Sequence, residues 1–329
     1  MGGTLAQIFP PAPSFTEKNL PSLKGNVYIV TGGNAGVGLE LVKFLYSAGG
    51  IVYIASRTAS KITAAISDIK TQYPSSSGTL KPLALDLSDL TTVPIAASQF
   101  LAQESRLDVL FNNAGIAHVP AGSVSKQGHE AHMGTNVLGH FLFTKLLTPI
   151  LIATSKISLP GTVRIVWTTS SIIDMSGPPG GLSMSELVPG QYSQDKARNY
   201  SSSKAANWFL ASEFSNHLSS HSIISISQNP GNLRTAAWNG IPWLVRKVMS
   251  VVLYEPKMGA YTELWCGLSP DVKLEDGGRM AIPWGRWHPD PRKDILESLK
   301  GEKEGGTGLA AEFWGWCEKE TKEYSKSTW

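Results

Sequence analysis

The feature that most constrains the fold of this chain is an alternation of short β-branched runs with longer helical patterns. The stretches between the runs carry apolar residues at three- and four-residue spacing, which is typical of amphipathic helices. Such alternation predicts an α/β fold, a doubly wound parallel sheet of about seven strands with helices on both faces. The expected strands lie at residues 26–33, 51–57, 80–88, 107–115, 162–171, 223–231 and near 279–284.

No linker or internal repeat divides the sequence, so we expect one domain over residues 23–329, preceded by an N-terminal arm over 1–22. Its core is predicted to span 23–237. Residues 174–198 are rich in Gly, Pro, Ser and Gln, which indicates an insertion loop. A substrate lid and C-terminal extension are expected over 236–329.

Composition excludes several classes of protein. Apolar residues make up 42% and charged residues 17% of the chain, as in a globular domain. The net charge of +3, without a run of Lys or Arg, gives no sign of nucleic-acid binding. Cys266 and Cys317 lie far apart and form no CxxC pattern, which favours a reducing compartment and no metal site.

The N-terminus lacks the basic and apolar regions of a signal peptide, so a cytoplasmic location is expected. The apolar stretch 241–254 is interrupted by Arg246 and Lys247 and is too short to span a bilayer. Association of this stretch with a membrane surface stays open as an alternative.

A glycine-rich segment, TGGNAGVG at residues 31–38, follows the first expected strand and opens the first expected helix. Glycines at 32, 36 and 38 let the backbone turn tightly and approach a pyrophosphate at the helix N-terminus. Glycines alone can also make a purely structural turn, but the strand–turn–helix context favours dinucleotide binding.

The end of the second expected strand distinguishes NAD from NADP. An acidic residue there would bind the ribose 2′-hydroxyl of NAD, whereas an arginine would pair with the 2′-phosphate of NADP. The sequence IVYIASRTASK contains Arg57 and no Asp or Glu. NADP(H) is therefore the predicted cofactor, with a solvated loop arginine as the alternative.

Four motifs follow one another within residues 23–237: TGGNAGVG, Asp86 in LALDLS, NNAG at 112–115 and YSSSK at 200–204. Through these motifs, residues 23–237 resemble the short-chain dehydrogenase/reductase family, in which they occur in the same order. The arm and the C-terminal tail resemble its fungal, retinol-dehydrogenase-like branch. The resemblance implies a Rossmann-type fold and an oxidoreductase. The implied cofactor-binding residues, together with Arg57, are Gly32, Asn34, Gly36, Val37, Gly38, Asp86, Leu87, Asn113, Ala114, Gly115, Tyr200, Lys204, Pro230, Gly231, Leu233 and Thr235.

The resemblance also implies individual roles. Asp86 would hydrogen-bond the adenine, and Asn113 the cofactor ribose. The backbone carbonyl of Asn136, in HMGTNVLGHF, would hold a water of a proton relay. Counting along RIVWTTSS places the catalytic serine at Ser170, with Ser171 as the alternative, because adjacent strand side chains point to opposite faces.

Two tyrosine–lysine pairs share the same spacing, Tyr192 with Lys196 and Tyr200 with Lys204. The residues after Lys204 show a buried helical face, whereas those after Lys196 do not. Asp195 is a plausible N-cap for the helix that would contain Tyr200. We therefore expect Tyr200 and Lys204 to act in catalysis and Tyr192 to lie in a loop before the helix.

The protein is predicted to be an NADP(H)-dependent oxidoreductase that acts on the carbonyl or alcohol of an apolar small molecule. Secondary metabolism is the predicted setting of this activity. Tyr200 would be the general acid or base, Lys204 would lower its pKa, and Ser170 would orient the substrate oxygen. An apolar substrate is expected because residues 236–254 are aromatic and aliphatic.

Several alternatives stay open. The same fold could serve a cyclase or isomerase with NADP(H) bound, or a module that senses NADP(H). A monomer and a homo-oligomer are both compatible with the sequence. His129 and His132 form no HExxH motif, so packing or solvated histidines are expected there and no metal site is predicted.

Overall fold

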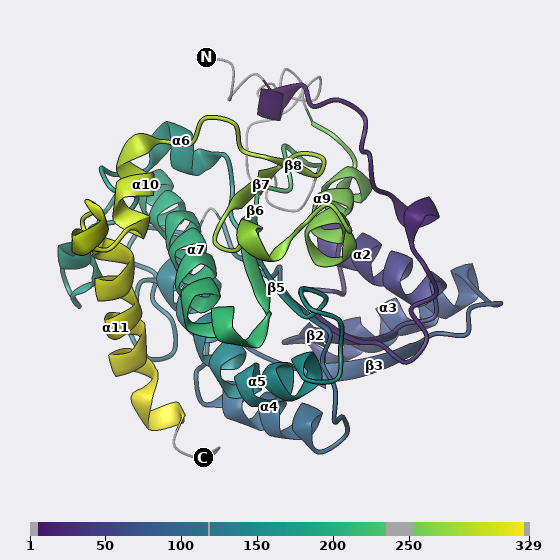
Figure 1. Cartoon of the computed structure of the whole chain (residues 1–329). Coiled ribbons are helices and arrows are strands. Elements are labelled where there is room, and N and C mark those ends of the chain that lie inside the picture. Colours follow the sequence, from purple (N-terminus) through teal and green to yellow (C-terminus); the bar gives the residue numbers. More distant parts are fainter. Residues whose placement is uncertain (1–5, 118, 235–252, 326–329) are drawn as a thin grey trace.

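The structure, a computed structural model, describes residues 6–117, 119–234 and 253–325. Strands and helices alternate along the chain as the sequence predicts (Figure 1). The strands are β1 (Val27–Thr31), β2 (Ile51–Ser56), β3 (Thr79–Ala84), β4 (Val109–Asn112), β5 (Arg164–Thr168), β6 (Ile224–Gln228), β7 (Met280–Ile282) and β8 (Arg286–Trp287). The helices are α2 (Gly36–Ser47), α3 (Ala59–Gln72), α4 (Thr92–Leu101), α5 (Gly139–Ser155), α6 (Ile172–Ser176), α7 (Lys196–Leu218), α9 (Pro256–Leu268), α10 (Lys293–Leu299) and α11 (Leu309–Thr321).

The strands form one sheet in the order β3-β2-β1-β4-β5-β6-β7-β8. All neighbours from β3 to β7 are parallel, which confirms the predicted doubly wound sheet, and β8 pairs antiparallel with β7. The strand β8 was not predicted, because two residues carry no periodicity. The strand order reverses between β1 and β4, and ligands of such sheets bind outside the carboxyl ends of the strands at this point.

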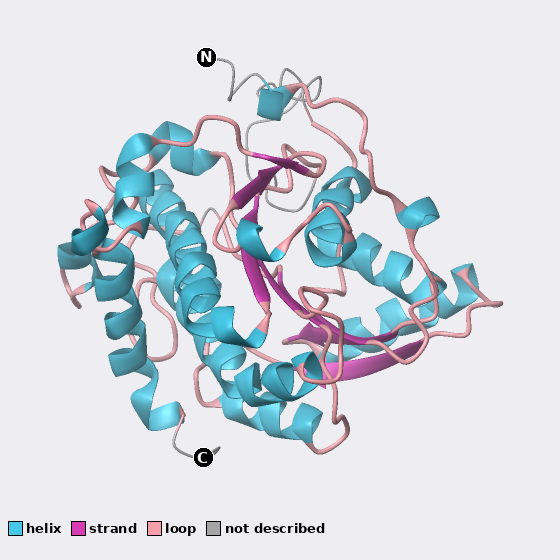
Figure 2. Ribbon diagram, in the orientation of Figure 1, coloured by secondary structure: helices cyan, strands magenta, loops and turns pink. Residues whose placement is uncertain are grey.

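Helices cover both faces of the sheet (Figure 2). On one face α4, α5 and α7 pack on the sheet around Phe100, Phe141 and Phe209, all fully buried. On the other face α2, α3 and α9 bury side chains such as Leu41 and Leu264. Two apolar layers of this kind explain why the central strands β1, β4, β5 and β6 are buried throughout, whereas the edge strand β3 keeps exposed positions.

The C-terminal part of the chain contributes to the sheet and its layers. The strand β7 lies beyond residue 237 yet pairs with β6, and α9 packs beside α2. The helix α11 lies along α7 on the opposite side of the molecule (Figure 1). Residues from Pro256 onward, which belong to the predicted C-terminal extension, are thus largely structural layers of the domain. The part of the predicted lid at 236–252 lies outside the described residues.

The predicted insertion loop at 174–198 is only partly irregular. It contains the end of α6, a short 3-10 helix at Met184–Leu187 and the start of α7. Among the described residues one helical stretch, Met133–Ser155, is long and apolar enough to cross a membrane, but 72% of its most apolar window is buried inside the molecule. The apolar residues of this stretch are those of a helix that packs between the sheet and the outer helices.

Candidate active site

The glycine turn joins the end of β1 to the start of α2. Gly32 has φ +70° and Gly36 has φ +57°, a region that favours glycine. A Cβ atom on Gly38 would lie 2.6 Å from Asn113 Nδ2 and 2.7 Å from the Gly32 carbonyl oxygen. The turn therefore needs glycine for close backbone approach, and it opens the N-terminus of a helix. Both properties fit a bound pyrophosphate.

A threonine at the end of β1 fixes the NNAG segment. Thr31 Oγ1 accepts hydrogen bonds from the backbone N–H groups of Asn113 and Ala114, both at 2.9 Å. Asn113 Nδ2 donates to the Thr31 carbonyl at 2.7 Å, and His140 Nε2 lies 3.0 Å from the Thr31 hydroxyl. The predicted ribose-binding residues are thus locked beside the glycine turn.

Asn136 lies in a π-helical turn, Met133–Leu138, at the start of α5. Its side chain pairs with the backbone of Ile116, accepting from N at 2.8 Å and donating to O at 3.1 Å. Its backbone carbonyl, predicted to hold a water, accepts a hydrogen bond from His140 Nδ1 at 3.0 Å. One of the two lone pairs of that oxygen is therefore already used by the protein.

Gly115 lies between the two polar groups of the predicted relay. A Cβ atom at this position would be 3.3 Å from Asn136 Oδ1 and 3.3 Å from Lys204 Nζ. The fold thus brings Asn136 and Lys204 to the same point although 68 residues separate them in the sequence (204 − 136).

The helix α7 begins as the sequence predicts. Asp195 caps it by accepting from two backbone N–H groups of the first turn, at 2.9 Å and 3.2 Å. Tyr192 lies before the helix and donates to the Gly128 carbonyl at 2.8 Å. Tyr200 lies on the helix with the Lys204 ammonium 5.7 Å from its ring centre. The structure therefore separates the two tyrosine–lysine pairs as expected.

Burial controls the protonation of the central pair. It raises the pKa of the Tyr200 phenol to about 12, and a hydrogen bond from Ser170 partly opposes this. Burial lowers the pKa of the Lys204 ammonium to about 8, against the attraction of Glu263. The predicted lowering of the Tyr200 pKa by Lys204 and the positive nicotinamide of an oxidised cofactor concerns the site with cofactor bound and stays a prediction. Tyr200 is a neutral proton donor near pH 7.

The two candidate serines differ in their surroundings. Ser170 interacts with the Tyr200 hydroxyl, and its Oγ also accepts from the Ile172 N–H at 3.3 Å. Ser171 occupies the N-cap position of α6 without a capping hydrogen bond from its side chain. The geometry favours Ser170.

The loop after β6 approaches the glycine turn through α9. Gly231 has φ +88°, and a Cβ atom there would lie 2.9 Å from the Trp284 ring. A Cβ atom on Gly259 of α9 would lie 2.3 Å from Leu233 Cδ1 and 3.0 Å from the Pro230 carbonyl oxygen. Gly259 is a residue that sequence reasoning missed, since nothing in its local pattern shows what packs against it.

The other predicted cofactor residues that the structure describes follow the carboxyl ends of β1, β2 and β3. Asp86 Oδ1 accepts from the backbone and hydroxyl of Ser88, at 3.0 Å and 2.6 Å, which orients its carboxylate. Arg57 follows β2, is exposed, and makes no ion pair within the described part of the chain. Leu87 and Val37 are buried, Asn34 is half-buried, and Thr235 lies outside the described residues.

Comparison with known proteins agrees with this arrangement. Residues 26–181 match the family model described as short chain dehydrogenase. The short-chain dehydrogenase/reductase iacJ of the fungus Pestalotiopsis fici is 43% identical over 323 residues, covering 97% of each chain. A short-chain dehydrogenase/reductase of Phomopsis amygdali is 42% identical over 326 residues, covering 97% of this chain and 96% of the relative.

This chain belongs to the short-chain dehydrogenase/reductase family. A solved structure of a putative uncharacterized protein from Mycobacterium paratuberculosis has the same fold, with a TM-score of 0.67 and 26% identity over 94% of this chain and 97% of that one. The family consists of oxidoreductases that use NAD(P)(H). The fungal relatives agree with the predicted fungal branch.

This short-chain dehydrogenase/reductase also has a buried polar cluster that the sequence does not reveal. Gln7 of the arm accepts from Asn229 Nδ2 at 2.8 Å and donates to Asp174 Oδ2 at 3.2 Å. His288 Nε2 lies 3.2 Å from the same Asp174 oxygen. The cluster joins the segment after Ser170 to the segment before the Pro230 loop, so the arm borders the candidate site.

The histidines of the HEAH segment pack as expected. The His129 ring contacts Trp316 at 5.8 Å between ring centres. His132 lies against Tyr200 at 5.7 Å, and its Nδ1 is 2.8 Å from Glu130 Oε1. The position of His132 beside the candidate acid was not predicted.

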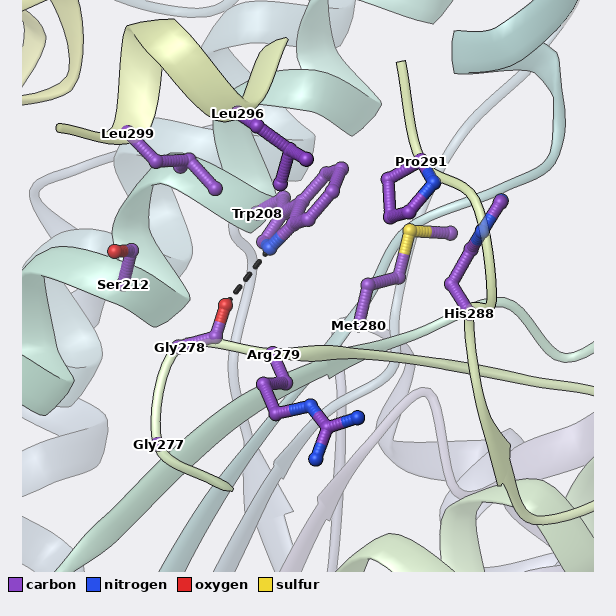
Figure 3. Close-up of a pocket in the computed structure, with 10 residues that line it drawn as sticks. All are labelled: Trp208, Ser212, Gly277, Gly278, Arg279, Met280, His288, Pro291, Leu296 and Leu299. Carbon is purple, nitrogen blue, oxygen red and sulfur yellow. Dashed lines mark hydrogen bonds between the residues drawn. The ribbon is translucent and has the colours of Figure 1, made fainter. Parts of the chain in front are cut away.

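A cavity of 240 Å³ lies between α7, β7 and α10 (Figure 3). Trp208, Met280 and Leu296 line it, and the Trp208 indole donates to the Gly278 carbonyl at 2.8 Å. None of the predicted catalytic or cofactor residues contributes to it. We therefore assign the candidate active site from the residues at the strand ends.

Proposed function

We propose that this protein is an NADP(H)-dependent oxidoreductase that interconverts a carbonyl and an alcohol on a small molecule. The observation that carries the proposal is the convergence of Ser170, Tyr200 and Lys204 beside a glycine turn that only glycine can form. When bound, the nicotinamide cofactor supplies or accepts the hydride.

The residues of the chain would handle the proton and the substrate oxygen. Tyr200 Oη holds a proton near pH 7, so in the direction of reduction it can donate to the substrate oxygen. Ser170 Oγ, already a partner of that phenol, can donate a hydrogen bond to the same oxygen as negative charge develops. Lys204 Nζ holds a positive charge at the inner side of the tyrosine ring and can bind ribose hydroxyls.

Arg57 supports NADP(H) over NAD(H). It is exposed at the carboxyl end of β2, next to the glycine turn, and the neighbouring residues contain no acidic side chain. A planar guanidinium suits the two oxygens of a phosphate. The apolar character of the substrate stays a prediction from sequence, because residues 235–252 lie outside the described residues.

The decisive experiment compares Tyr200→Phe with Tyr192→Phe. Oxidation of NADPH is followed by absorbance with a panel of ketones and aldehydes, and NADPH binding is measured by fluorescence. We expect Tyr200→Phe to lower kcat by roughly a hundredfold to ten-thousandfold with NADPH binding nearly unchanged. Tyr192→Phe should retain turnover. Full activity of Tyr200→Phe would rule out the assigned acid.

The cofactor preference is tested on Arg57→Ala in the same binding assay. Loss of a charge-assisted phosphate contact should weaken NADPH about tenfold or more and leave NADH almost unchanged. Equal effects on both cofactors would contradict the preference.

A further inference from the structure

Glu263 is a buried carboxyl group that the proposed mechanism does not use. Glu263 lies on α9, on the side that faces the sheet, and is 0% exposed. Oε1 lies 3.2 Å from the Thr168 hydroxyl and accepts from Gln228 Nε2 at 3.2 Å. Oε2 makes no hydrogen bond to any described residue.

Burying such a group is unfavourable unless it is paired. A carboxylate that has no direct ion pair and leaves one oxygen without a partner costs roughly several kcal/mol in a core, whereas an apolar side chain of similar size does not. The group responds by keeping its proton. Burial raises the pKa of the Glu263 carboxyl to about 8, although a hydrogen bond from Thr168 and the charge of Lys204 oppose the shift.

Thr168, the last residue of β5, connects Glu263 to the candidate active site. Its backbone carbonyl accepts hydrogen bonds from Lys204 Nζ at 3.1 Å and from Asn207 Nδ2 at 2.9 Å. Its hydroxyl contacts Glu263 and accepts from Gln228 Nε2 at 2.9 Å. A single residue thus holds the lysine ammonium with one oxygen and the carboxyl group with the other.

Few other charged or titratable groups face Glu263. Cys266 lies one turn further along α9, and burial raises the pKa of its thiol well above its usual range, so it stays neutral. Arg164 of β5 is buried, but its guanidinium donates to the backbone carbonyls of Cys266 and Ser269. Lys204 of α7 is the remaining cation whose charge Glu263 senses.

We propose that Glu263 is a positioning residue for Lys204, acting through Thr168 and, once ionised, holding the proton on the Lys204 ammonium as the solution becomes alkaline. This inference rests on the proposed role of Lys204. Near neutral pH, Glu263 is a neutral acid that keeps the Thr168 carbonyl aimed at the ammonium. As the pH rises, its negative charge appears where it favours the charged form of the lysine.

The test measures the lysine itself, in protein without cofactor or substrate. The NMR resonance of the Lys204 ε-carbon is titrated from about pH 6 to about pH 10 and assigned with Lys204→Arg. In Glu263→Gln, which keeps the shape and removes the charge, the midpoint should move about one pH unit lower. Glu213→Gln is the matched control, because Glu213 is also a buried glutamate but lies on α7 beside His217.

Glu263→Asp should restore part of the shift, since it keeps the carboxyl group. In the wild type, the infrared band of a protonated carboxyl should disappear over the same pH range in which Lys204 titrates, and be absent from Glu263→Gln. If Glu263→Gln does not fold, Glu263→Asp assigns the band instead, because it changes the surroundings of this carboxyl group and leaves that of Glu213 in place. An unchanged Lys204 midpoint in Glu263→Gln, or a wild-type Glu263 that ionises well below the range of Lys204, would overturn the inference.

The pH dependence of kcat then separates this inference from the proposed function. If carbonyls are reduced, the alkaline limb of the profile should move in Glu263→Gln by the same amount as the Lys204 resonance. If no carbonyl is reduced, the proposed function fails, while the lysine titration still supports or overturns the coupling.

Discussion

Two strand ends of this molecule are built alike and behave differently. β1 and β5 each end in a threonine, and each threonine contacts a fully buried titratable side chain, His140 beneath Thr31 and Glu263 beneath Thr168. Both threonines also fix residues of the candidate site.

At the end of β1 the polar groups satisfy one another. His140 Nδ1 donates to the Asn136 carbonyl, which can only accept, so Nε2 of the neutral ring is an acceptor that lies 3.0 Å from the Thr31 hydroxyl. The single proton of that hydroxyl is shared between this nitrogen and the Phe111 carbonyl oxygen, which lies 3.2 Å away. Both ring nitrogens are used, and burial lowers the pKa of His140 to about 4. The His140 ring, on the cofactor side of the site, is therefore uncharged at physiological pH.

At the end of β5 the network is incomplete. Glu263 leaves Oε2 without a partner among the described residues, and its proton is lost near pH 8. The comparison teaches that a satisfied buried network holds geometry, whereas a partly satisfied one can change charge close to working pH. Three measurements test this contrast, and they are ordered by the size of the expected effect.

The largest expected effect is a loss of stability in acid caused by His140. Its pKa in the folded state, about 4, is below the usual value of 6.5, so the unfolded chain binds the proton more readily. Stability that is present above pH 6.5 should fall by about 1.4 kcal/mol per pH unit and be about 3 kcal/mol lower near pH 4. Urea unfolding of the wild type and of His140→Gln across this range isolates the contribution. If the free energy of unfolding changes with pH equally in the wild type and in His140→Gln, His140 does not cause the loss of stability in acid.

The second effect compares His140→Leu with His140→Gln at pH 7. Leucine leaves the Asn136 carbonyl buried without its donor, whereas glutamine can still donate and accept. We expect His140→Leu to unfold about 2 kcal/mol more easily than His140→Gln. Equal stability of the two variants would show that the hydrogen bonds of His140 do not contribute to the free energy of unfolding.

The smallest effect has the opposite sign and concerns β5. The pKa of Glu263 in the folded state, about 8, is above its usual value of 4.5, so its contribution to stability is greatest below pH 4.5, falls as the pH rises from 4.5, and is lost by about pH 8. Near pH 8, Glu263→Met should therefore be more stable than the wild type by about 1 kcal/mol, after the lost hydrogen bonds to Thr168 and Gln228 are included. If Glu263→Met is less stable than the wild type at pH 8, and by the same amount at pH 5, the predicted effect of the Glu263 charge is contradicted.

Local patterns in the sequence predict much of the fold and of the candidate site as far as α7. The alternation of strands and helices, the glycine turn before α2, and the cap of α7 by Asp195 each depend on residues that are neighbours in the chain. The distinction between Tyr192 and Tyr200 depends on the same information, since one lies before a helix cap and the other after it.

Only the tertiary structure decides which polar residues become buried together. Nothing around Glu263 or His140 in the sequence distinguishes them from solvated side chains, because their burial comes from strands and helices far along the chain. The same holds for Gln7, whose partners are Asp174 and Asn229. The sequence by itself determined the family, the sheet and the positions of Tyr192 before the helix and Tyr200 on it, because periodicity, caps and glycine turns are local. The structure decided the protonation of Tyr200 and Lys204, because desolvation is set by everything that packs around a group.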